Sequence, residues 1–168
     1  NSGGPLLNLR GEVIGVNAQI ATGGANANAG VGFAIPASVV QRVVPALIEH
    51  GSFQWPWLGV TGGSVDLTIM RANKLDSQQG AYIHEVTEDS PADRAGLRGS
   101  TDVQVIAGIR VPVGGDVVVE ADGQPVASFD DLLAAVANKS PGDRIELVIV
   151  RDGRRRSVTV ELVQRPTE

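Results

Sequence analysis

The hydrophobic and polar positions divide this chain into three blocks. Residues 1–50 are apolar and rich in glycine and carry few charges. Residues 51–57 form a short connector that holds both tryptophans, and residues 58–168 carry most of the charge and a second set of elements. Since about 150 residues make a typical domain, the 168 residues allow one medium domain or two small ones. We expect a first segment over residues 1–51, a linker over 52–57 and a second domain over 58–168.

The first block begins with the pattern of a β-hairpin, in which two apolar runs flank a short polar turn. A cluster of small residues then predicts a loop, and a further short apolar run predicts a third strand. The expected elements are strands over residues 4–9 and 12–20, a turn at Arg10-Gly11, a loop over 22–30, and a strand over 32–35 that Pro36 ends.

From Ser38 onward the apolar spacing becomes helical, because valine, leucine and isoleucine recur on one face up to Ile48. Ser38 together with Gln41 predicts a capping box at the start of this helix. Gly51 predicts its end. Pro45 lies inside the run and predicts a kink or a helix shortened by a turn.

The second block predicts a mixture of strands and short helices. Ser90-Pro91 predicts a helix start, since serine caps the first turn and proline fits the first helical position. Ser128 with Asp131 predicts a capping box before a helix with apolar residues at i, i+3, i+4 and i+7. Asp152-Gly153 between two apolar runs is the strongest hairpin signal of the chain. The expected elements are strands beginning at residue 57 and over 80–86, 116–121, 145–150 and 157–162, and helices over 91–96 and 129–138.

Charge and composition narrow the function. The net charge of −5 argues against a nucleic-acid binder held by phosphate contacts. The absence of cysteine excludes disulfides, a thiol nucleophile and a thiolate metal site. The apolar runs are far shorter than the roughly 20 residues of a membrane-spanning helix. We expect neither a metal nor a cofactor. A start inside a tight turn suggests a piece of a longer protein.

Asn1-Ser2-Gly3-Gly4-Pro5, just before the hairpin, suits the chemistry of a nucleophilic serine. A serine hydroxyl becomes reactive when an imidazole takes its proton and backbone N–H groups stabilise the oxyanion. Gly3 and Gly4 would allow a substrate carbonyl to come close to the backbone. These residues suit a plain glycine-serine turn equally well, so on their own they leave both interpretations open.

Three motifs, in their order and spacing, resemble the last part of the catalytic domain of the HtrA/DegP serine proteases, the trypsin-like branch that carries PDZ domains. The resemblance implies that Ser2 is the nucleophile and that its N–H is one oxyanion donor. It also implies that Asn17, Ala18 and Gln19 pair with the substrate backbone. The family's histidine and aspartate lie upstream of the serine and have no counterpart here, so this chain alone is expected to be inactive. The motifs are Asn1–Leu6, Gly11–Asn17 and Gly32–Pro36.

The second block resembles a PDZ domain of the bacterial protease type. Backbone N–H groups of a Leu58-Gly59-Val60 turn can hold a C-terminal carboxylate, and the strand that follows offers an edge to an extended peptide. We expect the helix at 129–138 to present Leu132, Leu133 or Val136 to the terminal apolar side chain of the peptide. All of these side chains also suit the hydrophobic core. The resemblance rests on residues 57–60, 89–97, 115–119, 122–126 and 129–138.

Residues 98–114 depart from the family pattern, which joins the same two elements in a few residues. Alternation over residues 103–109 predicts an extra strand or hairpin, which we expect to lie beside the peptide groove.

The expected fold class is mainly β with α: the C-terminal part of a trypsin-like β-barrel followed by a PDZ domain, itself a partly open β-barrel with two helices. The resemblance implies a serine endopeptidase of the periplasm or cell envelope that cleaves unfolded proteins and binds C-terminal peptide tails. It implies no nucleic-acid partner, and a trimer-based homo-oligomer for the intact parent. The alternative is a non-catalytic PDZ peptide-binding module with a vestigial protease segment.

Overall fold

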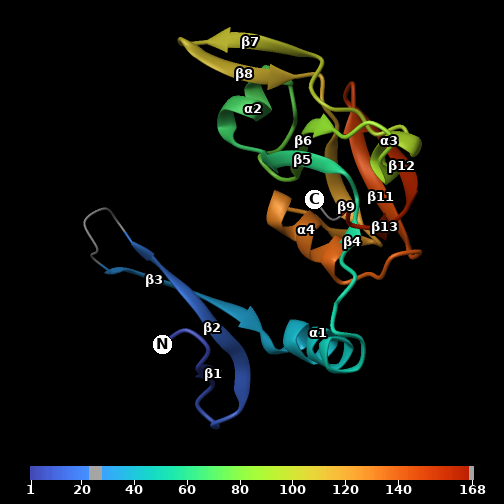
Figure 1. The fold of residues 1–168 in the computed structure, drawn as a ribbon. Helices are drawn as coiled ribbons and strands as arrows, with labels where there is room; N and C mark the ends of the chain where they lie inside the picture. The colour runs from blue at the N-terminus through green and yellow to red at the C-terminus, as the bar shows by residue number, and fades with distance from the viewer. Residues whose placement is uncertain (23–27, 167–168) are drawn as a thin grey trace. The chain divides into compact units, whose positions relative to one another are not determined.

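The computed structural model describes residues 1–22 and 28–166. The chain divides into two compact units, Asn1–Phe53 (unit 1) and Gln54–Glu168 (unit 2), and each is described by itself. Both are rich in β-structure (Figure 1). Among the described residues, no helix is both long enough and apolar enough to cross a membrane.

Unit 1 is an antiparallel sheet in the order β1-β2-β3, followed by a long helix. The predicted hairpin is present, and the Asn8 side chain closes its turn by accepting the N–H groups of Arg10 and Glu12. The predicted loop over 22–30 is too long, because Thr22 and residues 28–30 lie in strands. Its remaining residues, 23–27, lie outside the described part of the chain. The elements are β1 (Pro5–Leu7), β2 (Val13–Thr22), β3 (Asn28–Pro36) and α1 (Ala37–His50).

The long helix α1 begins differently from the prediction. Its N-cap is Pro36, one residue before Ala37, and no side chain caps the first turn. The predicted Ser38–Gln41 capping box is therefore wrong, because Ser38 already lies inside the helix. The helix continues past Pro45 to His50, and Gly51 ends it in the left-handed conformation at φ 71°, as expected from its position.

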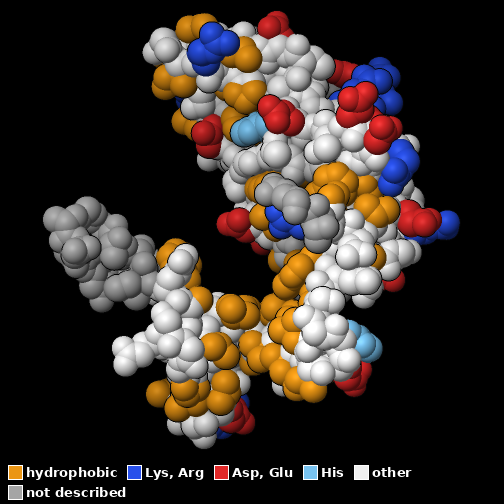
Figure 2. All heavy atoms as spheres, in the orientation of Figure 1, with side chains coloured by type: hydrophobic (Ala, Val, Ile, Leu, Met, Phe, Trp, Pro, Cys, Tyr) orange, Lys and Arg blue, Asp and Glu red, His pale blue; other side chains and the backbone are white. Residues whose placement is uncertain are grey.

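Unit 1 has almost no hydrophobic core of its own. No residue of α1 is buried, and none of the large apolar side chains described in this unit is buried. Figure 2 shows hydrophobic side chains gathered on the face of this unit that is in view. An apolar surface of this kind marks a face that another surface covers. The exposed side chains are Leu6, Leu7, Leu9, Val13, Ile14, Phe33, Ile35, Val44, Leu47 and Ile48.

Unit 2 is built on an antiparallel sheet in the order β12-β11-β9-β6-β5, with the short β10 beside β9. The predicted β11–β12 hairpin is present, and Asp152 and Gly153 both have positive φ, as a type I′ turn requires. Two further pairs, β4–β13 and β7–β8, lie outside this sheet. The strands are β4 (Pro56–Trp57), β5 (Val60–Ser64), β6 (Ala81–Val86), β7 (Asp102–Ile106), β8 (Ile109–Val113), β9 (Val117–Ala121), β10 (Gln124–Pro125), β11 (Arg144–Arg151), β12 (Arg154–Glu161) and β13 (Val163–Gln164).

Three helices cover unit 2: α2 (Leu67–Ala72), α3 (Pro91–Arg94) and α4 (Phe129–Ala137). The two predicted caps are present. The Ser90 side chain accepts the N–H of Asp93, and Ser128 and Asp131 form a reciprocal capping box. Hydrogen bonds from Ser128 and from the N–H of Ala127 lower the pKa of the Asp131 carboxyl. The helix α2 was not predicted, because six residues are too few to show a helical period.

Two hydrophobic clusters stabilise unit 2. The larger one joins Leu132 and Val136 of α4 to the buried side chains of β6, β9, β11 and β12, and also contains Leu58. The smaller one lies where α2 meets β8 and includes Ile69 and Val111. Apolar burial at these clusters supplies the main stabilisation of the unit.

The β7–β8 hairpin confirms the extra element predicted within residues 98–114. Its predicted position beside the groove is wrong. The hairpin packs on α2: the Asn73 side chain donates to the carbonyl of Pro112 and accepts the N–H of Gly114, and Val111 is buried beside Ile69. None of the hairpin's described residues lines the groove of α4, so the insertion leaves that groove open.

Candidate functional site

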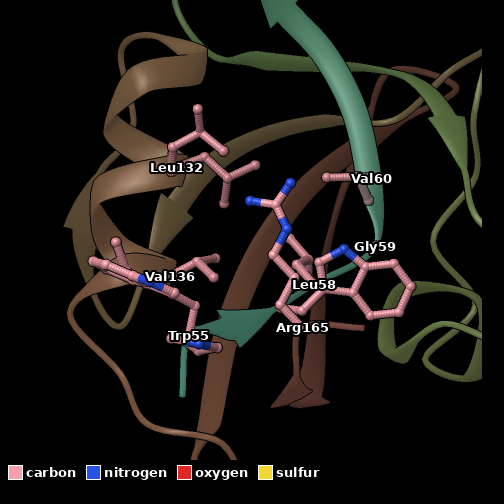
Figure 3. Close-up of a pocket in the computed structure, with 11 residues that line it drawn as sticks. Trp55, Leu58, Gly59, Val60, Leu132, Val136 and Arg165 are labelled. Carbon is pink, nitrogen blue, oxygen red and sulfur yellow. The ribbon is translucent and has the colours of Figure 1, made fainter. Parts of the chain in front are cut away.

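A groove of about 330 Å³ lies between α4 and the segment that leads from β4 into β5. Figure 3 shows its two walls, with the helix on one side and Leu58, Gly59 and Val60 on the other. Apart from Arg165 and the glycine, the lining side chains are apolar, as is typical of sites for small ligands and chain ends. The lining residues are Trp55, Pro56, Trp57, Leu58, Gly59, Val60, Leu132, Leu133, Val136, Ala137 and Arg165.

The carbonyl groups of Leu58 and Gly59 point away from the groove, toward the segment that begins α3. Gly59 has φ 84°, a conformation that side chains disfavour. The Leu58 carbonyl accepts the N–H of Ala92 at 2.9 Å. The Gly59 carbonyl accepts the N–H of Thr87 at 2.9 Å and the hydroxyl of Ser90 at 3.3 Å. In a trans peptide the N–H points opposite to the preceding carbonyl. The N–H groups of Gly59 and Val60 therefore point away from the segment that begins α3.

Strand β5 is the edge of its sheet, since it pairs with β6 on one side only. Along an antiparallel edge, every second residue turns its N–H and C=O outward, where they can pair with an added strand. Val60 opens this edge directly after the turn. The turn and the edge together present donors and acceptors along one wall of the groove.

The structure places all six residues predicted for the peptide groove in its lining. They differ in burial. Leu58, Leu132 and Val136 also belong to the hydrophobic core and form the floor, whereas the Leu133 side chain is 48% exposed at the rim. The sequence left open whether these residues belong to the hydrophobic core or to the groove. Leu58, Leu132 and Val136 belong to both.

Sequence reasoning missed five side chains of this lining as groove residues. Four of them flank predicted positions, and a wider window around the turn and the helix would have included them: Trp55, Pro56, Trp57 and Ala137. Arg165 had no signal, because its position depends on the pairing of β13 with β4. Its N–H donates to the Trp55 carbonyl at 2.8 Å, which brings a residue from the end of the chain to the groove.

The second candidate site, in unit 1, surrounds Ser2. The Ser2 hydroxyl is exposed and donates to the Ala18 carbonyl at 2.6 Å. The next residue, Gly3, has φ 83° and donates its N–H to the Asn17 carbonyl, while the N–H of Asn17 donates to the Gly4 carbonyl. The serine turn is thus fixed to β2 by backbone pairing.

The residues predicted to pair with the substrate backbone lie beside Ser2. Ser2, Asn17 and Gln19 line one hollow of about 520 Å³, and Phe33 lies on its far strand. The register of β2 against β3 shifts between Asn17 and Gln19, so Ala18 lies at a bulge. Both backbone groups of Asn17 are already used by Gly3 and Gly4.

Within the described part of unit 1, the Ser2 hydroxyl donates to the Ala18 carbonyl and not to His50. His50 lies exposed at the end of α1, with Nε2 3.6 Å from the Glu49 carboxylate. His84 lies on β6 in unit 2, and its buried Nε2 has no hydrogen-bond partner among the described residues. The described residues also include no cluster of three or more metal-ligating side chains.

A mainly antiparallel sheet, a helix across its edge and a glycine turn at the mouth of the groove define a PDZ domain. The family model of the PDZ domain matches residues 56–162, and the chain belongs to this family.

Beyond the PDZ domain, the chain resembles HtrA/DegP serine proteases over its whole length, as its motifs indicated. It is 39% identical over 168 residues to a probable DegP-like periplasmic serine endoprotease of Chlamydia trachomatis serovar D. It is 35% identical over 166 residues to the periplasmic serine endoprotease DegP of Escherichia coli strain K12. The chain covers 100% and 98% of its own length in these matches, and 31% of each relative.

Solved structures agree with this assignment. The HtrA-type protease AlgW with decapeptide aligns with a TM-score of 0.70 at 30% identity, over 99% of this chain and 46% of that one. The serine endoprotease from Yersinia pestis aligns with a TM-score of 0.58 at 25% identity, over 98% and 48%. The expected fold class, a β-rich protease segment followed by a PDZ domain, is confirmed.

Proposed function

We propose that unit 2 binds the C-terminal ends of extended peptides. The observation that carries this proposal is the apolar groove between α4 and the Leu58-Gly59-Val60 turn, whose carbonyls are bonded inward. Two solved relatives are described as HtrA-type protease AlgW with decapeptide and with tripeptide, which supports a peptide as the ligand.

In this proposal each part of the groove has a separate task. The backbone N–H groups of the turn bind the terminal carboxylate, because outward N–H groups in one concavity form an anion site. The peptide adds to the free edge of β5 as a further strand. Its last side chain, an apolar one, packs on Leu58, Leu132 and Val136, and Leu133 contacts the preceding residues at the rim.

We further propose that the full-length protein carrying this sequence is a serine endopeptidase in which Ser2 is the nucleophile. Residues 1–51 would be the C-terminal part of its protease domain, 52–57 a linker and 58–168 the PDZ domain. The Ser2 hydroxyl would leave the Ala18 carbonyl and give its proton to a histidine outside this chain. The Ser2 N–H would stabilise the oxyanion, and residues 17–19 would wall the substrate site.

The relatives' names also support a location and a role for the full-length protein. They are called periplasmic serine endoproteases, which favours an extracytoplasmic site of action. The PDZ groove would recruit unfolded proteins by exposed chain ends. The exposed apolar side chains of unit 1 favour association with another surface, and the family resemblance implies a homo-oligomer built on trimers.

Peptide binding is tested by titrating the chain with one apolar-ended decapeptide, synthesised as the free acid and as the C-terminal amide. Tryptophan fluorescence reports binding, since both tryptophans line the groove. We expect the acid to bind at least about 10-fold more tightly, the size of one or two charge-assisted hydrogen bonds. Equal affinity for acid and amide would overturn carboxylate capture.

The protease assignment is tested with a fluorophosphonate probe and casein. In the full-length protein we expect labelling and cleavage that Ser2→Ala abolishes, and in this chain alone neither. If the full-length wild type is not labelled, the alternative of a non-catalytic peptide-binding module with a vestigial protease segment is correct.

A further inference from the structure

A positively charged side chain enters the peptide groove of unit 2 from outside the segment that matches the family model. Arg165 follows β13, beyond residue 162, where the PDZ match ends. Its backbone is fixed by the bond to the Trp55 carbonyl. Figure 3 shows its guanidinium pointing between α4 and β5, in the space that Leu132 and Val60 border.

Arg165 is also the one charged residue in the described lining of this groove. The remaining lining residues are apolar or glycine, so the groove offers the guanidinium no carboxylate. Within the described residues, the Arg165 side chain forms no ion pair or hydrogen bond, although five other Arg or Lys side chains pair with a carboxylate. Arg165 is exposed at this groove and has no carboxylate partner there, so its guanidinium can bind an anionic ligand, and its planar fork of donors matches a carboxylate.

We propose that Arg165 binds the terminal carboxylate of the peptide and thereby restricts the groove to free chain ends. This inference rests on the proposed function and adds a side-chain donor to the backbone N–H groups of the turn. The guanidinium donates to the carboxylate from the open side of the groove, opposite the N–H groups of Gly59 and Val60. The carboxylate is then held from two sides, and its charge is neutralised.

Two other roles for this side chain make different predictions. Arg165 could pair with an acidic side chain further along the peptide, in which case its removal affects only peptides that carry one. It could also fill the empty groove and be displaced by any peptide, in which case its removal tightens binding. The carboxylate role is favoured because the side chain runs from beside the Leu58-Gly59 turn to the level of Val60, whose outward N–H is one of the proposed carboxylate donors (Figure 3).

A double-mutant cycle between protein and peptide tests the proposal. The protein is the wild-type chain or Arg165→Gln, and the probe is a decapeptide that ends in leucine, has no charged side chain and is either the free acid or the amide. Arg165 is exposed, so its replacement leaves the core intact, and its backbone bond to Trp55 is kept in any variant. Arg154→Gln is the matched control, since Arg154 is exposed on β12, at the far edge of the sheet from β5.

We expect Arg165→Gln to weaken binding of the acid roughly 10-fold and binding of the amide less than about 2-fold, as for a charge-assisted hydrogen bond at an exposed site. Arg165→Lys should recover part of the loss, because lysine keeps the charge without the fork. The wild-type preference for the acid should shrink as salt rises, and this salt effect should disappear in Arg165→Gln. Arg154→Gln should behave as wild type.

The failures of this inference and of the proposed function are distinguishable. If the wild type binds acid and amide equally, carboxylate capture itself is wrong. If the wild type prefers the acid but Arg165→Gln weakens acid and amide by the same factor, Arg165 does not bind the carboxylate. Tighter binding of both peptides by Arg165→Gln would show that the side chain occludes the groove. A loss seen only with a glutamate-containing peptide would assign it to an upstream acidic residue.

Discussion

Gly59 is a position of the candidate groove where a single added methyl group should destabilise unit 2. Its φ of 84° lies in the left-handed region, which costs a residue with a Cβ about 1–2 kcal/mol. A Cβ at Gly59 would also overlap the Cβ of Ser90 and lie 2.6 Å from its hydroxyl oxygen. Ser90 is fully buried and caps α3, so it cannot move aside without loss.

The two effects add to a large fraction of the stability of a small domain. Overpacking a filled interior costs about 1–3 kcal/mol, so Gly59→Ala should lower the free energy of unfolding by about 2–5 kcal/mol. Typical domains have about 5–15 kcal/mol in total. At about 4 °C or more per kcal/mol, unit 2 should melt about 8 °C lower or more.

The measurement is urea unfolding followed by tryptophan fluorescence, since both tryptophans lie in unit 2. Gly63→Ala, on the strand β5 that follows the turn, is the matched control. Gly63 does not have positive φ, and its nearest neighbour would be the His84 ring at 3.6 Å, an ordinary contact. We expect the control to stay within about 1 kcal/mol of the wild type. A Gly59→Ala variant as stable as Gly63→Ala would refute the geometry assigned to the turn.

Three further predictions concern stability and association. Asp116 is fully buried and accepts two hydrogen bonds of 2.6 Å from Arg151, so Asp116→Ala should lower the free energy of unfolding in urea by about 3–5 kcal/mol. Glu161→Gln, which removes the exposed pair with Arg144, should lower it by only about 0–1 kcal/mol. The pKa of the Asp122 carboxyl lies below its ordinary 3.8, first because Lys139 donates a hydrogen bond to it and then because the Glu146 N–H does. The contribution of this carboxylate to stability is therefore present above that pH and is lost as the pH falls through the lowered pKa. Asp122→Asn should thus make the melting temperature fall less steeply below about pH 4. The exposed apolar face of unit 1 should make the chain associate, and sedimentation velocity at two concentrations should show less association for Leu9→Asp with Ile48→Asp; equal sedimentation of variant and wild type would contradict this.

Local signals in the sequence predicted the elements that local interactions determine. Ser90, Ser128 and Asp152-Gly153 satisfy or direct backbone groups within four residues of themselves, and each element they mark is present. The predicted start of α1 is wrong because Pro36 occupies the N-cap position, so Ser38 already lies inside the helix. Six-residue α2 left no periodic pattern, and its one local signal was Asp66, which caps Ile69.

The groove was only partly predictable, because some of its residues meet through long-range pairing. The turn and α4 could be predicted, since both have strong motifs and the family arrangement places them face to face. The position of Arg165 could not be predicted, because only the pairing of β13 with β4 brings it beside Trp55. The sequence also could not separate groove floor from core, since Leu58 and Leu132 serve as both and a hydrophobic pattern is the same for either.

Fold and candidate function meet in the segment that leads into α3. The Ser90 hydroxyl caps that helix by accepting the Asp93 N–H and also donates to the Gly59 carbonyl. Thr87 and Ala92 bind the carbonyls of Gly59 and Leu58 from the same segment. A carbonyl that bonds to this segment makes the N–H of the next residue point away from it, because the two groups lie on opposite sides of a trans peptide. These bonds therefore orient the N–H groups of Gly59 and Val60 before any ligand binds. A peptide end would therefore meet donors already in place and would not have to order them, which is where preorganised sites gain affinity.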